Sequence, residues 1–236
     1  MKLPIPPAVN YRGIIFDFNG VLLWDTALHI QAWQTCALQL RGTPLSEAEF
    51  SVHVYGRTNA HILKHITCRQ VCGTELDELT QIKESLYRQL CLENSEQFIL
   101  SPGAAALLDY LADHSIPRTI ATASEKTNLD FFVAHLDLEK WFDLKKIVYD
   151  NGIIANKPAP DIYLQAAARI GVAPQRCVVV EDALSGIQAA YAAGIGCIIG
   201  LGPKPIHDRL LANPGVCAAI ENLEQFPRQL IDTTRS

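Results

Sequence analysis

The chain has 236 residues, of which 49% are hydrophobic, and its formal net charge at pH 7 is −5. This length suits one large domain or a core domain with a modest insert, and the apolar fraction excludes a disordered chain. The negative charge argues against nucleic acid or an anionic membrane as a partner, because neither counterion release nor electrostatic steering would favour contact.

No stretch of the sequence has the ~18 consecutive apolar residues of a membrane span. Residues 1–7 lack the apolar region of a secretory signal. The seven cysteines follow no regular framework, which is typical of reduced thiols packed as small hydrophobic groups. We therefore expect a cytoplasmic protein, a monomer or weak homodimer, with no nucleic-acid or membrane partner.

The first predicted element is a buried strand over residues 13–16, which ends at Asp17 and leads into a turn at Gly20. Amphipathic helices follow with no convincing strand among them. The first helix is stopped by Gly42, and the second begins at a capping box over residues 46–49 and ends before Gly56. The third helix is capped by Thr58 or Asn59 and closes near Gly73, and a long fourth helix starts at Thr74.

From residue 98 strands and helices alternate. Strands are predicted over 118–121, ending in Thr122-Ala123-Ser124, and over 147–149, 177–180 and 197–199. Helices are predicted over 104–114, through 131–136, from a cap at Asp161 to Gly171, and over 185–194. The carboxyl terminus adds a helix, a candidate edge strand at 218–220 and a short final helix. This alternation indicates right-handed βαβ units with both faces of the sheet covered. We predict an α/β fold: a doubly wound, Rossmann-like parallel sheet formed by residues 1–24 and 98–236, with an inserted α-helical cap domain over 25–97.

Four polar clusters come at or just after the carboxyl ends of separate predicted strands: Asp17, Thr122, Lys157 and the pair Glu181-Asp182. A plain turn aspartate would account for Asp17 alone, but not for four such clusters. Their chemistry suits phosphoryl transfer, with a carboxylate nucleophile, oxygen ligands for Mg²⁺, and a cation and a hydroxyl for the phosphoryl oxygens.

The same clusters resemble the motifs of the haloacid dehalogenase superfamily. The matching segments are Asp17-Phe18-Asn19-Gly20, Thr122, Lys157-Pro158-Ala159-Pro160-Asp161, and residues 181–190, which read EDALSGIQAA. They are similar to the branch with a small helical cap, which contains phosphoglycolate phosphatases, sugar-phosphate phosphatases and β-phosphoglucomutase.

The resemblance assigns a role to each matching position. It implies that Asp17 is the nucleophile and that Mg²⁺ is held by Asp17, the backbone carbonyl of Asn19 and Asp182, with Glu181 in support. Thr122, Ala123 and Lys157 would bind the phosphoryl group.

Position 19 departs from the family pattern, because the family has an acid/base aspartate there. Asn19 keeps the backbone carbonyl, but its carboxamide has no titratable proton, and loss of such a group typically lowers a rate by ~10²–10⁴. Three explanations remain open: a weak or specialised phosphatase, a phosphate-binding relative without turnover, or an aspartate that was deliberately replaced.

Two residues of the cap are candidate substrate contacts. Arg57 lies in the segment Gly56-Arg57-Thr58-Asn59, where similar enzymes place an arginine that reaches the substrate, and Arg suits anion recognition. His29 lies near the first hinge, and a solvent-facing helix histidine explains it equally well.

His61, His65, Cys68 and Cys72 recur at helical spacing. One straight helix cannot surround a zinc ion with all four, because its ends would lie ~16 Å apart. An interior-facing or mixed helix face is the main interpretation, and a two-ligand partial site is the minor one.

These observations predict a Mg²⁺-dependent phosphomonoesterase that acts on a small phosphorylated metabolite through an aspartyl-phosphate. A non-catalytic module that binds a phosphorylated metabolite is the alternative, and a sugar-phosphate mutase is the third.

Overall fold

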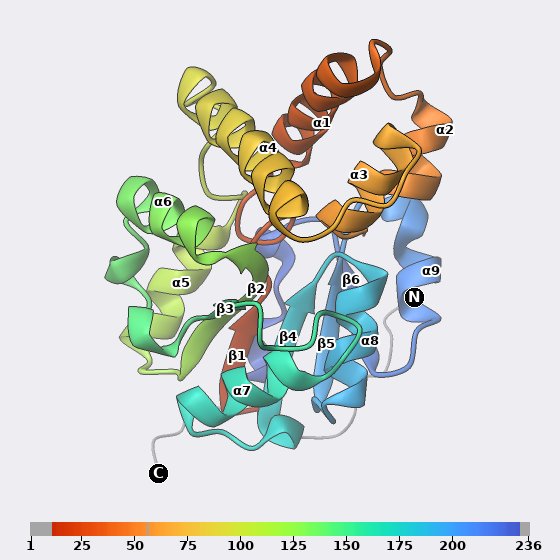
Figure 1. Ribbon diagram of the computed structural model, residues 1–236. Coiled ribbons are helices and arrows are strands. Elements are labelled where there is room, and N and C mark those ends of the chain that lie inside the picture. Colours follow the sequence, from red (N-terminus) through yellow and green to blue (C-terminus); the bar gives the residue numbers. More distant parts are fainter. Residues whose placement is uncertain (1–10, 56, 232–236) are drawn as a thin grey trace. The chain divides into compact units, whose positions relative to one another are not determined.

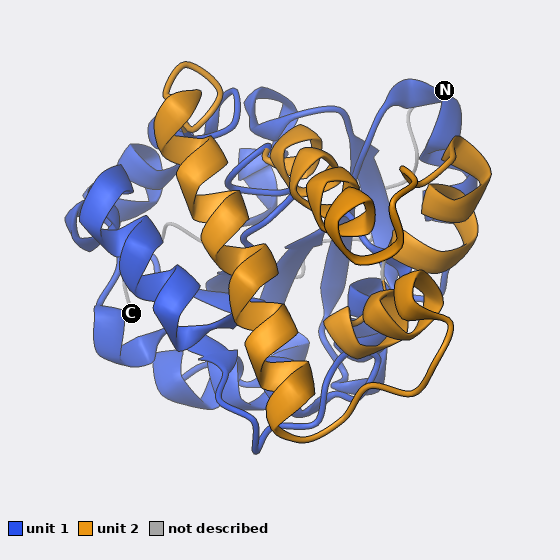
Figure 2. Ribbon diagram, turned by 45° about the horizontal axis from the view of Figure 1, so that its top comes forward, with its two compact units in different colours: residues 1–24, 100–236 blue, residues 25–99 orange. Residues whose placement is uncertain are grey.

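The computed structural model describes residues 11–55 and 57–231, and the chain divides into two compact units, which Figure 2 colours separately. The core unit consists of Met1–Trp24 and Leu100–Ser236, and the cap unit is the continuous segment Asp25–Ile99. The second boundary falls two residues later than the one expected from the sequence. Residues 1–7 and Gly56, which the sequence analysis used, lie outside the described residues.

Within the described residues, the core unit has a six-stranded parallel sheet in the order β3-β2-β1-β4-β5-β6 (Figure 1). The strands are β1 (Gly13–Phe16), β2 (Arg118–Glu125), β3 (Val148–Asp150), β4 (Cys177–Glu181), β5 (Cys197–Leu201) and β6 (Val216–Ile220). The chain runs outward from β1 to β3 and then crosses back to β4. The strand order therefore reverses between β1 and β4, and in such sheets ligands bind outside the carboxyl ends of the strands at this switch point.

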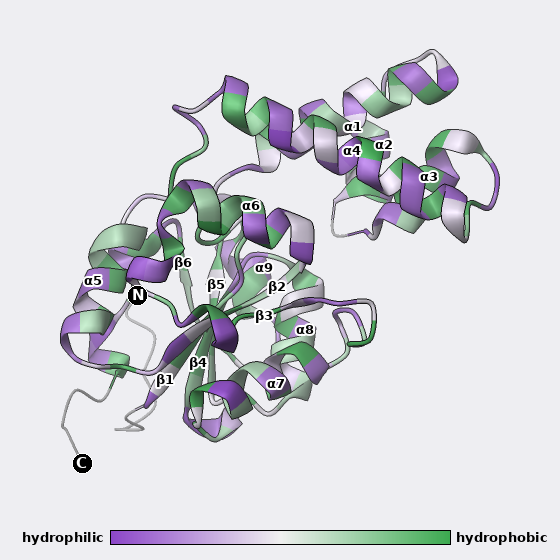
Figure 3. Ribbon diagram, turned by 60° about the vertical axis from the view of Figure 1, so that its left-hand side comes forward, coloured by the Kyte–Doolittle hydropathy of each residue, from purple (hydrophilic) through white to green (hydrophobic). Residues whose placement is uncertain are grey.

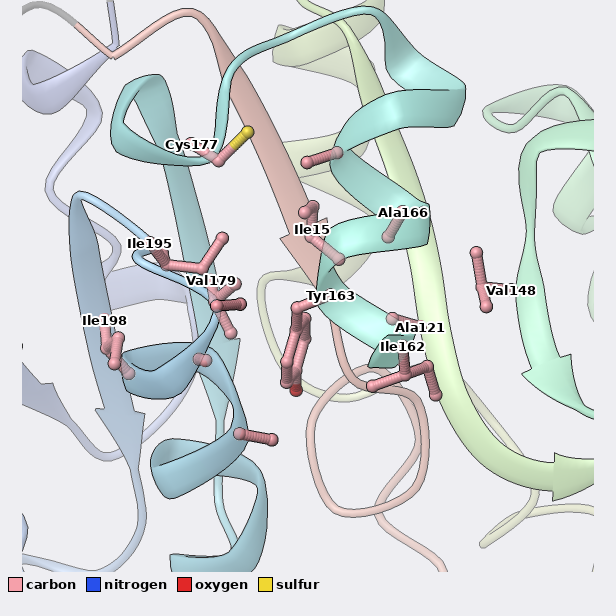
Figure 4. Close-up of a cluster of buried hydrophobic side chains, with 14 of the residues drawn as sticks. Ile15, Ala121, Val148, Ile162, Tyr163, Ala166, Cys177, Val179, Ile195 and Ile198 are labelled. Atoms are coloured by element: carbon pink, nitrogen blue, oxygen red, sulfur yellow. The ribbon is translucent and has the colours of Figure 1, made fainter. Parts of the chain in front are cut away.

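In the described part of the core unit, one α-helix precedes each of the strands β2 to β6. These helices are α5 (Ala104–Asp113), α6 (Lys126–Leu136), α7 (Asp161–Ile170), α8 (Leu184–Ala192) and α9 (His207–Leu211). Figure 4 shows Ile15 of β1 and Val179 of β4 beside Tyr163 and Ala166 of α7, in one buried apolar cluster. Burying one such aliphatic side chain contributes ~1.5–3 kcal/mol, so this cluster fixes the two strands that lead to the switch point.

The neighbouring residue Phe16 points to the opposite face of the sheet, as the alternation of a strand requires. Its ring packs edge-on against Phe142, which follows α6, with 6.4 Å between the ring centroids. Both faces of β1 are therefore covered, and all four of its residues are buried. The continuous apolar run Gly13–Phe16 is the sequence pattern expected for a strand buried on both sides.

The cap unit contains only helices among its described elements: α1 (Thr26–Arg41), α2 (Glu47–Glu49), a π-helix (Phe50–Val54), α3 (Asn59–Thr67) and α4 (Thr74–Glu93). In Figure 3, α1 and α4 alternate between hydrophobic and hydrophilic along their length, as amphipathic helices do. The apolar sides of α1, the π-helix and α3 share a buried cluster that includes Trp33, Phe50 and Leu63. None of the helices described in either unit is long and apolar enough to cross a membrane.

The capping box over residues 46–49 is present, but the segment that it opens is one α-helical turn followed by the π-helix. The third helix ends at Thr67, well before Gly73. Cys68 has a left-handed backbone conformation (φ 55°), and its N–H bonds to the carbonyl of His65. A non-glycine residue in this conformation stops the helix, and sequence periodicity does not reveal it.

Three expectations for the core unit were wrong in detail. β2 continues to Glu125, just past the residues 122–124 at which the strand was expected to end. Asp161 is the first residue of α7, and Pro160 occupies the cap position without a side-chain hydrogen bond. The short final helix consists of two 3₁₀ turns, Leu223–Gln225 and Arg228–Leu230.

Candidate active site

Asp17 follows β1 directly, and its backbone N–H donates to the carbonyl of Val180 in β4 at 3.1 Å. This bond fixes the carboxylate at the switch point between the two strands. The Asp17 residue is only 8% exposed. A buried carboxylate needs a partner, because an isolated buried charge is strongly unfavourable.

Lys157 is that partner. Its Nζ lies 2.8 Å from Oδ1 of Asp17 and 2.5 Å from Oε1 of Glu181, so one ammonium group joins the ends of β1 and β4. The same Nζ lies 5.1 Å from the ring centroid of Tyr163. Lys157 precedes Pro158 through a cis peptide bond. Charge-assisted bonds of this kind are about twice as strong as neutral ones, and here they set the orientation of Asp17.

Glu181 is fully buried and has further donors besides Lys157. Its Oε1 accepts from the Tyr163 hydroxyl at 2.8 Å, and its Oε2 accepts from the backbone N–H of Ala183 at 2.9 Å. A Cβ at Gly186 would lie 1.6 Å from Oε1, so only glycine leaves room for this carboxylate. The sequence analysis gave no role to Tyr163. The sequence signal that could have indicated this role is the position of Tyr163 near the start of the helix that follows Lys157-Pro158.

Asp17, Glu181 and Asp182 each offer a carboxylate oxygen, and these three oxygens lie within 4.8 Å of one another. Gly20 has a φ of +81°, and a Cβ there would come within 2.2 Å of Oδ2 of Asp182, so glycine makes room for this side chain. Mg²⁺ prefers hard oxygen ligands and binds through one or two carboxylates while keeping several waters. Because both oxygens of Glu181 already accept hydrogen bonds, Asp17 and Asp182 are the side chains best placed to hold the ion.

The electrostatics of the cluster fit a divalent cation as well. Burial raises the pKa of Asp17 to about 7, although Lys157 opposes the shift. Burial, together with the charges of Glu181 and Asp17, also raises the pKa of Asp182. Burial alone would lower the pKa of Lys157, but the two neighbouring carboxylates hold it well above its usual value. A cation between Asp17 and Asp182 would stabilise their charged forms and so oppose the burial that raises both pKa values.

Ser124 of β2 bonds to two polar side chains, one from the loop after β1 and one from β2 itself. The sequence analysis gave Ser124 no role at this site. Its hydroxyl donates to Oδ1 of Asn19 at 2.7 Å, and its backbone N–H donates to Oγ1 of Thr122 at 3.0 Å. Thr122 is buried, whereas the neighbouring Ala123 is exposed. The Thr122 hydroxyl thus accepts one bond and keeps its own hydrogen for a ligand oxygen.

The cap unit holds the remaining two candidates, Arg57 and His29. Arg57 is exposed, and its Nε donates to the carbonyl of Val52 at 3.3 Å. His29 does not simply face solvent. Its Nε2 lies 3.2 Å from Oδ2 of Asp25, its Nδ1 lies 2.9 Å from Nζ of Lys83, and its ring stacks on Tyr87 with 3.9 Å between the centroids.

This histidine is therefore part of a polar network buried inside the cap. Lys83 and Glu84 are paired at 2.9 Å, and Glu84 also accepts from Asn59 at 3.1 Å. The Tyr87 hydroxyl donates to Asp25. Breaking a buried ion pair by removing one partner typically costs ~3–5 kcal/mol, so this network holds α1, α3 and α4 in a defined arrangement. Buried Lys83 and Tyr87 were not singled out in the sequence, because a lysine and a tyrosine on an amphipathic helix are ordinary surface residues.

A sequence model of the haloacid dehalogenase-like hydrolase family matches residues 11–194. Among curated proteins, the fructose-1-phosphate phosphatase YqaB of Escherichia coli is 31% identical over 80% of this chain and 96% of its own. The phosphorylated carbohydrates phosphatase of Thermotoga maritima is 29% identical over 89% of this chain and 94% of its own.

Among solved structures, a HAD hydrolase of family IA, variant 3, from Entamoeba histolytica superposes with a TM-score of 0.87 at 37% identity. The match covers 94% of this chain and 98% of that one. The chain therefore belongs to the haloacid dehalogenase-like hydrolase family. The recognition made from the motifs is confirmed, and so is the predicted doubly wound parallel sheet.

Proposed function

We propose that this hydrolase is a Mg²⁺-dependent phosphomonoesterase acting on a small phosphorylated metabolite of the carbohydrate class. The observation that carries the proposal is the Asp17 carboxylate, held by Lys157 beside Asp182 at the switch point. The similarity to phosphatases of phosphorylated carbohydrates and of fructose-1-phosphate supports the substrate class.

In this proposal a carboxylate oxygen of Asp17 attacks phosphorus, and the bond from phosphorus to the substrate oxygen breaks. Lys157 holds Oδ1 in place, while the hydroxyl of Thr122 and the backbone N–H of Ala123 donate to the phosphoryl oxygens. Water then attacks the aspartyl-phosphate, which frees inorganic phosphate and restores the carboxylate. Bound Mg²⁺, held by Asp17, Asp182 and the backbone carbonyl of Asn19, would neutralise charge on the phosphoryl oxygens.

Position 19 decides how fast this reaction runs. The oxygen that leaves must gain a proton, and the carboxamide of Asn19 cannot supply one. Its Oδ1 is instead fixed by the Ser124 hydroxyl. We expect turnover to depend strongly on the leaving group, so that sugars phosphorylated at the anomeric oxygen, whose leaving oxygen is the more acidic, react faster than primary alkyl phosphates.

Asn19 also favours a second candidate function, a protein that binds a phosphorylated metabolite without turnover. Lys157, Thr122 and the carboxylates would then bind the ligand and the ion, and the missing acid/base group would preserve the ligand. In both functions we propose that Arg57 of the cap unit contributes to substrate recognition. The ring nitrogens of His29 already contact Asp25 and Lys83, so we assign His29 to the cap network instead.

The test is Mg²⁺-dependent phosphate release from sugar phosphates and small-acid phosphates, with native protein beside the Asn19→Asp variant. Restoring the carboxyl group should raise turnover of alkyl phosphates by ~10²–10⁴-fold, because that is the usual contribution of general acid–base catalysis. Asn222→Asp is the matched control, since Asn222 caps a 3₁₀ turn through its side-chain oxygen, which aspartate retains.

Asp17→Ala should abolish phosphate release both in otherwise native protein and when combined with Asn19→Asp. Unchanged turnover in the Asp17→Ala variant would overturn the mechanism. If neither native protein nor Asn19→Asp releases phosphate, while the native protein binds a phosphorylated sugar in a calorimetric titration, the binding function replaces the hydrolytic one.

A further inference from the structure

Three histidines of the cap unit lie together although they come from two different elements. His53 belongs to the π-helix, whereas His61 and His65 are one turn apart on α3. The ring of His53 stacks on that of His65 with 3.9 Å between the centroids, and it lies 5.8 Å from that of His61. The objection that one helix cannot surround an ion applies to α3 alone, and His53 adds a ligand from a second element.

Glu49 contacts one of these three histidines, as a carboxylate that supports a metal ligand does. Its Oε1 lies 2.7 Å from Nε2 of His65 and 2.6 Å from a guanidinium nitrogen of Arg41. Metal-binding histidines commonly donate one ring N–H to a carboxylate, which fixes the tautomer and leaves the other ring nitrogen free to coordinate. In the tautomer that donates Nε2–H to Glu49, His65 presents the lone pair of Nδ1.

Exposure and local backbone suit uptake of an ion from solution. His61 is exposed, and His53 and His65 are half-buried, so an ion reaches the rings without opening the cap core. The stacked rings do not yet point at one centre. An ion bound by all three rings would require His61 and His53 to turn about their side-chain torsions. π-Helical turns are rare and occur frequently at functional sites, and this one brings His53 to α3.

We propose that His53, His61 and His65 form a cap-unit site for an imidazole-binding divalent transition-metal ion such as Zn²⁺, with Glu49 orienting His65. Neutral imidazole is a favoured ligand of Zn²⁺, and three such ligands leave the fourth tetrahedral position to water. The ion would join the π-helix to α3. This site differs in chemistry from the oxygen site at Asp17 and Asp182, which suits Mg²⁺, and it does not depend on the proposed phosphatase activity.

The test is a calorimetric titration of the full chain with Zn²⁺ in the presence of excess Mg²⁺. We expect one Zn²⁺ site that is lost in His61→Ala and in His53→Ala and retained in Asp182→Asn. Glu49→Gln should weaken it by ~10–100-fold, the usual effect of removing such a supporting group. Glutamine can still complete the capping box with Ser46, so the helix start is preserved.

His114→Ala is the matched control, because His114 is an exposed helix-end histidine of the core unit. The double variant Cys68→Ser, Cys72→Ser excludes binding by the two exposed thiols. Far-UV circular dichroism checks that each variant is folded. Equal Zn²⁺ affinity in native protein and in folded His61→Ala and His53→Ala, or loss of the site in the cysteine variant alone, would overturn the proposal. So would the absence of any Zn²⁺ binding by native protein.

Discussion

At the residue scale, the most constrained group of the candidate site is Glu181, which the family resemblance presents as a supporting metal ligand. Its two oxygens accept from Lys157, Tyr163 and the N–H of Ala183. The structure thus gives this carboxylate a positioning function: it holds Lys157, which in turn holds Asp17. A motif identifies the residue type, but it does not show which neighbours use its lone pairs.

Gly186 allows a direct test of this positioning function. In Gly186→Ala the new Cβ would overlap Oε1 of Glu181, so the carboxylate must move and Lys157 loses an anchor. We expect destabilisation of ~1–3 kcal/mol, typical of overpacking, together with a fall in kcat. Ser185→Ala, one residue earlier on α8, is the control, and it should leave both the stability and kcat nearly unchanged. Native-like kcat in Gly186→Ala would show that the position of Glu181 does not matter.

Asn19 and Ser124 show where residue-scale prediction from sequence stopped. The substitution at position 19 was evident, because it breaks a motif. Its hydrogen bond to Ser124 was not, because the two residues are 105 positions apart and lie at the ends of two different strands. Contacts of this kind follow from strand length and register, which are set by the packing of the whole sheet.

At the element scale, the helical cap was predictable from apolar periodicity, while its irregular parts were not. The capping box at Ser46 and Glu49 and the left-handed glycine that ends α1 are local signals, and both are present. The early end of α3 depends on Cys68 in a left-handed conformation, which the residue type disfavours. The π-helix inserts an extra residue into a turn without changing the hydrophobic pattern enough to reveal itself.

The cap core gives an element-scale prediction. Leu63 of α3 is fully buried in the cap cluster, so Leu63→Ala should lower the free energy of unfolding by ~2–5 kcal/mol through lost burial and the cavity left behind. Leu92→Ala on α4 is the control, because Leu92 is 55% exposed and should change stability by less than ~0.5 kcal/mol. Denaturant unfolding of both variants measures the difference, and equal midpoints would contradict the assignment of Leu63 to a packed core.

At the scale of the whole molecule, the alternation of strands and helices predicted a parallel sheet, and the right-handed crossover rule restricts its strand order. The reversal between β1 and β4 then brings Asp17 beside Glu181 and Asp182 although more than 160 residues separate them in sequence. The resulting crowding of carboxylates is a property of the fold, and we expect it to couple the stability of the protein to pH and to divalent ions.

Without a bound cation, Asp17 should make the protein less stable as pH rises. Its pKa is raised from 3.8 to about 7, so the folded state binds the proton more tightly than the unfolded state does. The associated stability is present in full below about pH 4 and is lost as pH rises through about 7. Asp17→Asn, which carries no charge at any pH, should flatten this decline in thermal unfolding, whereas Asp130→Asn on the surface of α6 should not.

Mg²⁺ should reverse that decline, because ligation requires the deprotonated carboxylates of Asp17 and Asp182 and so displaces their protons. The increase in melting temperature on adding Mg²⁺ should therefore be larger at pH 8 than at pH 6. At a free ion concentration ~100 times the dissociation constant, the gain would be ~2.7 kcal/mol. Asp182→Asn, which removes one ligand, should lose most of the response, while Asp130→Asn should keep it. A response at pH 6 equal to that at pH 8 would mean that the ion does not compete with protons on these carboxylates, and the metal site would then lie elsewhere.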